Sequence, residues 1–300
     1  MFLLGLALAV TTGCDDTPLT TGGGGGGFRI VWPSASADVE DAETFAVAIF
    51  PLTTAEPASF TASVDGGPEI SGLRNGSDSV VAFPLAGLTD GSHTISVRAG
   101  AGASRFRSFT VSLAPRPSIT DVDPDTAVLG ADQQITISGT GFIASSQQMR
   151  VYLNGVRLPI VQASSTTELV ASVDGTGLRT GLLSVATTVT AANRRISREL
   201  IPFRVVGGDD LPDEPQVMLA DPSAAPNDAP VILYGKNFGA GDIPSFNSLE
   251  STPILPLGAQ SLGFGVGLVQ FGLTIVPPVA TTQDGVVAIG SGTSFPFFVR

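Results

Sequence analysis

The chain has 300 residues, a formal net charge of −12 at pH 7 and only 14% charged residues. A nucleic-acid-binding protein needs a basic face that displaces counterions from phosphates, so 15 basic residues against 27 acidic ones argue against such a partner. The single cysteine, Cys14, and the single histidine, His93, exclude an intrachain disulfide, a thiolate metal cluster and a two-histidine metal site. Segments rich in valine, isoleucine, threonine and phenylalanine, with 36 glycines and 22 prolines, favour an all-β chain.

The N-terminus carries an unbroken apolar run, Phe2–Val10, followed by Thr11–Cys14. As a helix the run spans about 14 Å, roughly half of the hydrocarbon core of a membrane, which predicts a signal peptide over residues 1–13. The small residue before Cys14 resembles the lipobox of bacterial lipoproteins. That resemblance implies cleavage before Cys14 and acyl chains on its thiol and new amino group, so that the membrane becomes a partner through the lipidated N-terminus. An ordinary cleaved signal with an incidental cysteine is the alternative.

Residues 14–27 include six consecutive glycines, Gly22–Gly27, and are predicted to form a flexible tether. A phosphate-binding loop is the alternative, but it needs a preceding strand and a following lysine with serine or threonine, which this segment lacks. Asp15 and Asp16 resemble an inner-membrane retention signal of some enteric bacteria, but the rule differs among lineages. We expect a bacterial envelope location at the outer membrane or cell surface rather than the inner membrane.

The first predicted module covers residues 28–114. It contains six short apolar segments, with a turn about every 10–15 residues, which fits an immunoglobulin-like sandwich: 28–33, 44–50, 60–64, 79–84, 88–98 and 105–113. The stretch Leu88–Arg98 resembles bacterial immunoglobulin-like modules. We expect His93 to be a structural hydrogen-bonding group beside a turn, since no nucleophile and acid accompany it. Trp32 is expected to pack in the core or at the module edge, with a sugar platform as the alternative.

Three landmarks then occur twice at nearly constant spacing. Pro117–Pro124 returns as Pro215–Pro222, an offset of 98 residues. Ile135–Phe142 returns as Val231–Phe238 with an offset of 96, and the Pro-Phe-x-Val segment at Pro202 returns at Pro296 with an offset of 94. Such spacing predicts duplicated domains, at residues 116–207 and 213–300.

The first copy resembles the TIG/IPT family of immunoglobulin-like domains, found in plexins, Rel-type transcription factors and bacterial surface proteins. The resemblance is carried by Pro117–Pro124, Gly130, Ile135–Phe142, Val151–Gly155 and the strands at 167–173 and 181–185. It implies that residues 116–207 form such a domain and that residues 213–300 form a second, divergent one. Within the repeated motif, Ile135 and Ile137 share one sheet face, Gly139 takes a bulge or positive φ, and Phe142 folds back to close the sandwich.

The second copy departs after Phe238. Pro244, Pro253 and Pro256 interrupt the expected strand region, because proline cannot donate within a central ladder. From Leu262 to Leu268 apolar residues alternate with glycines, and the apolar phase shifts at Val269, which predicts a bulge or bend between 268 and 269. The glycine-lined face either admits another surface or packs within its own domain. Since the copies differ here, Gly239–Val276 is the expected location of function.

Acidic residues at the module junctions are candidates for calcium: Asp121, Asp123, Asp209 and Asp210. Neither group has the spacing of a calcium loop, so a solvated linker is the preferred interpretation and no cofactor is expected. No Gly-x-Ser-x-Gly elbow or distinct carboxylate pair supports catalysis.

We therefore expect three tandem immunoglobulin-like β-sandwiches after a signal and lipidation segment and a Gly-rich tether. The expected function is that of a non-enzymatic cell-envelope lipoprotein in surface adhesion, scaffolding or protein–protein interaction. A carbohydrate-binding accessory protein for surface polysaccharide is the alternative. The expected partner is an envelope protein or a glycan.

Overall fold

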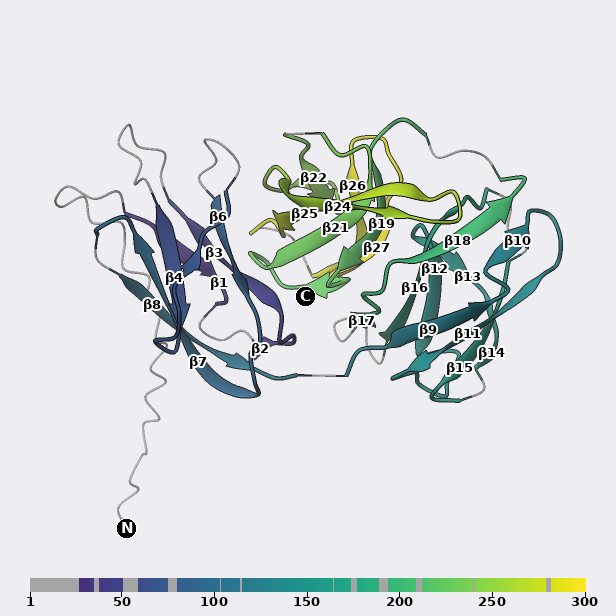
Figure 1. Ribbon diagram of the computed structural model, residues 1–300, viewed down its shortest axis with the longest axis horizontal. Helices are drawn as coiled ribbons and strands as arrows, with labels where there is room; N and C mark the ends of the chain where they lie inside the picture. The colour runs from purple at the N-terminus through teal and green to yellow at the C-terminus, as the bar shows by residue number, and fades with distance from the viewer. Residues whose placement is uncertain are drawn as a thin grey trace, which may run out of the picture.

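The structure is a computed structural model (Figure 1) and describes residues 27–34, 38–50, 59–74, 80–102, 104–113, 115–163, 165–173, 177–188, 194–208, 212–239, 241–278 and 282–300. Every regular element in these residues is a β-strand, and the strands form sheets that pack as immunoglobulin-like sandwiches, which confirms the all-β prediction. No helix in the described part of the chain is long and apolar enough to span a membrane.

The first sandwich packs a three-stranded sheet on a five-stranded one. The three-stranded sheet has the order β1 (Arg29–Trp32), β3 (Thr44–Ile49), β6 (Val80–Leu85). The five-stranded sheet has the order β2 (Asp38–Val39), β8 (Arg105–Val111), β7 (Gly91–Ala99), β4 (Phe60–Val64), β5 (Ile70–Ser71). The alternating segments predicted the six longer strands, whereas the two-residue strands β2 and β5 are too short to leave a pattern.

The second sandwich pairs a four-stranded sheet with a six-stranded one. The four-stranded sheet has the order β14 (Ile160–Ala163), β15 (Glu168–Ser172), β11 (Gln134–Thr140), β9 (Ser118–Asp123). The six-stranded sheet has the order β10 (Thr126–Val128), β18 (Ile201–Val206), β16 (Gly181–Thr188), β12 (Met149–Leu153), β13 (Val156–Leu158), with β17 (Arg194–Ile196) also pairing with β16.

The third sandwich repeats this plan. Its four-stranded sheet has the order β19 (Gln216–Asp221), β21 (Pro230–Lys236), β25 (Gly267–Ile275), β24 (Leu255–Leu262). Its five-stranded sheet has the order β20 (Ala224–Ala225), β27 (Phe295–Val299), β26 (Gln283–Ile289), β22 (Pro244–Phe246), β23 (Leu249–Glu250). In all three sandwiches the second strand pairs in parallel with the last strand, and a cis X-Pro bond follows the first strand.

A tight turn recurs at the same place in each sandwich. Its first residue has positive φ and is Asp65, Asn154 or Asn247. Because the following residue also has positive φ, each is a turn of the type that matches the twist of a hairpin. The side-chain oxygen of this residue accepts a hydrogen bond from the main chain of the neighbouring long strand at 2.7–2.9 Å. All three sandwiches therefore share a structural turn that was not among the landmarks of the duplication argument.

The repeated glycine has a clear steric role. A Cβ on Gly139 would overlap the carbonyl oxygen of Ser118 and lie 2.5 Å from the ring of Phe142. The pairing of β11 with β9 shifts register at this glycine, so the predicted bulge is present. In the third sandwich Gly235 lies in the same way against Gln216 and Phe238. The glycine thus allows the first strand and the aromatic ring to approach the main chain. The φ of Gly139 is not positive, whereas that of Gly141 is.

The expectation for the C-terminal segment was wrong in two respects. The alternating stretch is not one strand, because residues 263–266 form the turn of the β24–β25 hairpin, where Phe264 and Gly265 have positive φ. The register shift lies between Pro256 and Gly258 and not at residues 268 and 269. Strands also include two of the prolines: Pro244 begins β22, and Pro256 lies in β24 at the sheet edge, where a missing donor is tolerated.

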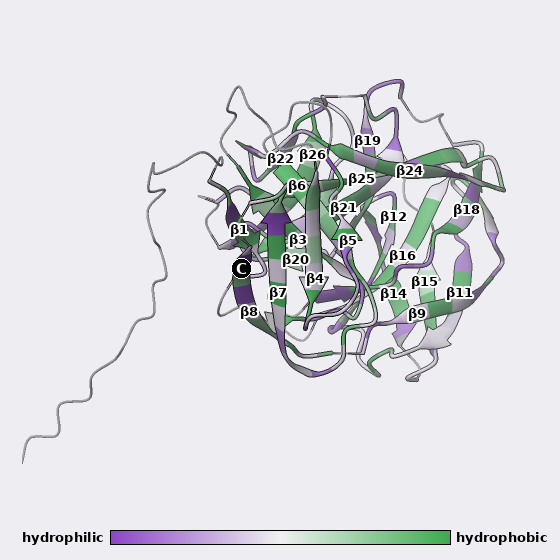
Figure 2. Cartoon of the chain, turned by 60° about the vertical axis from the view of Figure 1, so that its left-hand side comes forward, coloured by the Kyte–Doolittle hydropathy of each residue, from purple (hydrophilic) through white to green (hydrophobic). Residues whose placement is uncertain are grey.

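The third sandwich lies between the first two, so the order in space differs from the order along the chain (Figure 1). In Figure 2, where the first sandwich comes forward, its strands overlap those of the third, and the strands of the second lie to one side. Tyr152 and Leu182 of the second sandwich share a buried cluster with Phe295 of the third. Ala82 of the first sandwich packs against Leu273 of the third. The molecule is consequently a packed unit in which all three sandwiches contribute to shared apolar contacts.

Candidate functional site

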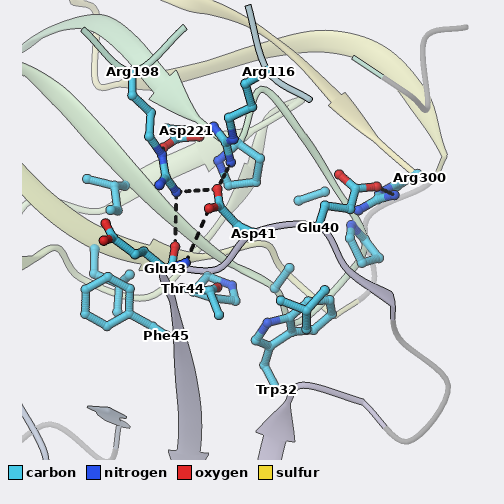
Figure 3. A pocket seen from close by; sticks show the side chains of 18 residues that line it. Trp32, Glu40, Asp41, Glu43, Thr44, Phe45, Arg116, Arg198, Asp221 and Arg300 are labelled. Carbon is cyan, nitrogen blue, oxygen red and sulfur yellow. Dashed lines mark hydrogen bonds and ion pairs between the residues drawn. The ribbon is translucent and has the colours of Figure 1, made fainter. Parts of the chain in front are cut away.

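The junction of the three sandwiches gathers an ion-pair network. Asp221, at the end of β19, has a side chain that is only 1% exposed and accepts hydrogen bonds from Arg116 Nη1 at 2.6 Å and Arg198 Nε at 2.7 Å. Arg116 lies between β8 and β9, and Arg198 follows β17. Asp41 of the first sandwich pairs with both arginines, at 2.5 Å from Arg198 Nη2. Two arginines and two aspartates therefore connect all three sandwiches (Figure 3).

A second group of ion pairs lies beside the first. Glu40 binds Arg195 Nη1 of the second sandwich at 2.6 Å and Arg300 Nη1 of the third at 2.5 Å. The side chain of Glu40 is 14% exposed and that of Arg195 13% exposed. Because pairs with little solvent access are screened weakly by salt, the two charges of each pair attract one another more strongly than in a surface pair, and removing one of them would leave a poorly solvated charge.

Burial and neighbouring charges shift the pKa of three groups in and beside this network. Burial lowers the pKa of Arg195, although Glu40 opposes that effect. Burial also acts against the charge of Arg198, but Asp221 and Asp41 outweigh it and raise the pKa of that guanidinium. Nearby, burial and then the negative charge of Asp221 raise the pKa of Tyr234 to about 12. These shifts favour the cationic form of Arg198 and the neutral form of Tyr234.

A small cleft of about 60 Å³ opens beside the network. Its walls combine the paired charges with apolar side chains from the first and third sandwiches, among them Trp32, Phe45, Pro226, Ile232 and Leu273 (Figure 3). Such a volume admits a few water molecules, whereas pockets for small organic ligands measure roughly 300–1,000 Å³. The cleft is therefore suited to a hydrated joint between sandwiches rather than to a substrate.

The residues singled out from the sequence lie elsewhere. Asp121 and Asp123 are exposed on β9, whereas Asp209, Asp210 and Cys14 lie outside the described residues. Within the described ranges no group of three or more His, Cys, Asp and Glu residues could hold a metal ion.

The two residues with open interpretations in the first module are both packed. His93 donates hydrogen bonds from Nδ1 to the Asp65 carboxylate at 2.7 Å and from Nε2 to the carbonyl oxygen of Thr89 at 2.8 Å, so it is the expected structural hydrogen-bonding group. Trp32 is 5% exposed and lines the junction cleft. A sugar platform at Trp32 is therefore wrong, because its ring offers no open face.

The sequence interpretation missed the junction network entirely. Its members are far apart in the chain: Glu40, Asp41, Arg116, Arg195, Arg198, Asp221 and Arg300. One signal was available, because Arg194–Glu199 holds four charged residues in a chain where only 14% of residues are charged. Asp221 also occupies the position of Asp123 in the duplicated motif, but only Asp221 is buried.

Comparison with known families identifies the second sandwich. Residues 117–197 match the family described as IPT/TIG domain. These residues form an IPT/TIG domain. The domain contains β9 to β17 and supplies Arg195 to the junction network through β17. No curated protein matches the sequence.

Several solved structures show limited similarity to the chain. A surface glycan-binding protein, SGBP-B of Bacteroides ovatus, in complex with a mixed-linkage heptasaccharide, has 14% identity and a TM-score of 0.26, over 90% of this chain and 66% of that one. The plexin A4 extracellular region has 9% identity and a TM-score of 0.26, over 88% of this chain and 33% of that one. An auxiliary nutrient binding protein from Bacteroides ovatus has 9% identity and a TM-score of 0.25, over 30% of this chain and 21% of that one. The chain spans less than two thirds of the length of each, and similarity at this level carries no information on what the chain binds.

Proposed function

We propose that the chain is a non-enzymatic scaffold of the bacterial envelope, anchored through Cys14, that presents a protein-binding surface. The observation that carries this proposal is the junction network, because its polar groups connect the sandwiches to one another. A flexible array of modules would not need buried ion pairs between its first, second and third members. A packed unit holds its outer surfaces in fixed relative positions, as a scaffold requires.

The surface best suited to a partner is the free edge of β24. This strand ends the four-stranded sheet of the third sandwich, and Gly258–Ser261 are exposed. The 33 residues from Ser251 to Gln283 carry no charge. Natural proteins usually protect long edge strands with charges, prolines or covering segments, and the only such residue in β24 is Pro256 near its start. The exposed Leu268, at the end of the same hairpin, extends this uncharged surface.

The proposed occupant is an extended segment of another envelope protein that pairs with β24 through main-chain hydrogen bonds. In a chain of net charge −12, an uncharged edge is where an acidic or neutral protein approaches with the least repulsion. The glycan alternative needs exposed aromatic platforms. Among described residues, the aromatic side chains that are strongly exposed are Phe106, at 69%, and Phe264, at 47%, and they lie on different sandwiches.

The test places a photocrosslinking amino acid at Ala259 of β24 and, as a matched control, at Val161 of β14, which is also an exposed residue on an edge strand. We expect a discrete crosslinked envelope protein from position 259 and none from 161. Adding Ser261→Lys, an exposed position on the same face of β24, to the protein that carries the crosslinker at 259 should lower the yield without changing the melting temperature. Equal products at both positions would exclude a specific edge. Glycan-array binding that is lost on changing Phe106 and Phe264 would replace the protein partner by carbohydrate.

A further inference from the structure

Three arginines lie on one face of the second sandwich, where it meets the third. In the six-stranded sheet Arg157 is paired with Tyr152, Arg150 with Ala186, and Arg194 with Thr188. Side chains two residues apart on a strand point to the same face of the sheet, as do those of paired residues. Positions 150 and 152 are two apart, and so are 186 and 188, so the three arginines share one face. The face is the outer one, since Tyr152 contacts Phe295 of the third sandwich at a ring separation of 5.5 Å.

This cluster is short of negative charge. The ion pair found here joins Arg194 Nη2 to Asp284 Oδ1 at 2.8 Å. Arg150 uses Nη1 for the carbonyl oxygens of Gln147 and Met149, each at 2.7 Å, which holds its guanidinium in place without neutralising it. Burial and then the charge of Arg157 lower the pKa of Arg150. Three cations with one carboxylate form a positive region on a protein that is otherwise strongly acidic.

Arg194 is the member with unmet hydrogen-bonding capacity. Its side chain is 9% exposed, and its Nε and Nη1 atoms are buried without a partner. A buried donor that lacks an acceptor costs about 1–3 kcal/mol, and more for a charged group. Asp284, which accepts from the third nitrogen, is 64% exposed and is therefore free to move away. Its carboxylate shows that an oxyanion fits at the mouth of the cluster.

We propose that Arg150, Arg157 and Arg194 form a binding site for an oxyanion, a carboxylate or a phosphate group, with Asp284 occupying the site when the ligand is absent. Guanidinium groups bind both anions through charge-assisted hydrogen bonds. Displacement of Asp284 gives the ligand access to Arg194, while Arg150 and the exposed Arg157 attract it. The two chemical sources, a phosphate-bearing and a uronate-bearing envelope component, share this chemistry and are separated by experiment.

The experiment measures the melting temperature and the heat of binding of the purified protein with inorganic phosphate and with galacturonate. Four variants are compared: Arg150→Gln, Arg157→Gln, Asp284→Asn and, as the control, Arg204→Gln, an exposed arginine of the same sandwich. Loss of one charge-assisted hydrogen bond weakens binding by about tenfold or more. We expect that loss in the Arg150 and Arg157 variants, wild-type affinity in the Arg204 variant, and tighter binding in the Asp284 variant.

The two ligands decide the source. Binding of phosphate alone supports a phosphate-bearing ligand, binding of galacturonate alone supports an acidic sugar, and binding of both supports general oxyanion recognition. The absence of binding by either ligand would overturn the proposal. An equal effect in all arginine variants, which indicates an adventitious ion only, or weaker binding by the Asp284 variant, would overturn it too. Melting temperatures without anion show whether each variant is folded, so a folding defect is recognised separately.

Discussion

Replacing Asp221 by asparagine should destabilise the junction of the three sandwiches. The change keeps the size of the side chain and removes the charge that Arg116 and Arg198 share. Removing one partner of a buried ion pair typically costs about 3–5 kcal/mol. Here the arginine side chains are 18% and 33% exposed and retain Asp41, so a loss of about 2–3 kcal/mol is expected.

Urea denaturation followed by tryptophan fluorescence measures this loss. Trp32 is the sole tryptophan of the chain and lines the cleft between the first and third sandwiches, so its emission reports on their separation. With a slope of about 2–3 kcal/mol per M for a protein of this size, the midpoint should fall by about 1 M urea.

The matched control is Asp123→Asn. Asp123 precedes Pro124 as Asp221 precedes Pro222, but it is exposed, so its replacement should cost less than about 0.5 kcal/mol. Equal midpoints for the two variants would show that the network contributes nothing to stability. A double-mutant cycle with Arg198→Gln then gives the coupling energy, which should lie at about 0.5–3 kcal/mol for directly contacting charges.

Further predictions concern other parts of the chain. The pKa of His93 is raised, mainly by its hydrogen bond to Asp65. The stabilisation from this pair is therefore complete below about pH 6.5 and is lost as the pH rises through the folded-state pKa. The difference in melting temperature between wild type and His93→Gln should accordingly shrink from about pH 6 to pH 9. Gly139→Ala should cost about 1–3 kcal/mol in denaturant unfolding, because the added Cβ meets Ser118 main chain, and an unchanged midpoint would contradict the steric argument. Cys14→Ala should release the protein from the membrane fraction, and unchanged membrane association would rule out lipidation.

Elements with local signals were predictable from the sequence. The alternation around Ile135 and Ile137 placed β11 and its inward face, and both residues are fully buried. The Asn-Gly pair at Asn154 marked the turn between β12 and β13. These predictions succeeded because strand alternation and positive-φ turns depend on residues that are neighbours in the chain. The prediction for residues 263–266, which form a hairpin turn, was wrong for the same reason. Glycines spaced two residues apart give the same local pattern as an alternating strand.

The candidate sites depended on contacts that local patterns do not encode. Arg116 and Asp221 are 105 residues apart and meet only because the third sandwich packs between the other two. Acidic pairs near the linkers were visible as a pattern, and the described members, Asp121 and Asp123, are solvated. Charged residues were singled out from the sequence where several of them are close together in the chain. Whether a charged residue is buried depends instead on how the sandwiches are arranged in space.

The different fates of Asp123 and Asp221 indicate how duplication and function are related in this chain. Both residues end the first strand of a sandwich, and the first sandwich has Trp32 at the equivalent position, so the fold itself does not require a carboxylate there. Only Asp221 faces the first sandwich, and it meets arginines from the linker and from the second sandwich. Burying a carboxylate is costly unless cations surround it, so Asp221 and its arginines depend on one another. The repeated motif thus supplies a carboxylate at an equivalent position in each copy, and the packing of the third sandwich turns one of them into the centre of the junction.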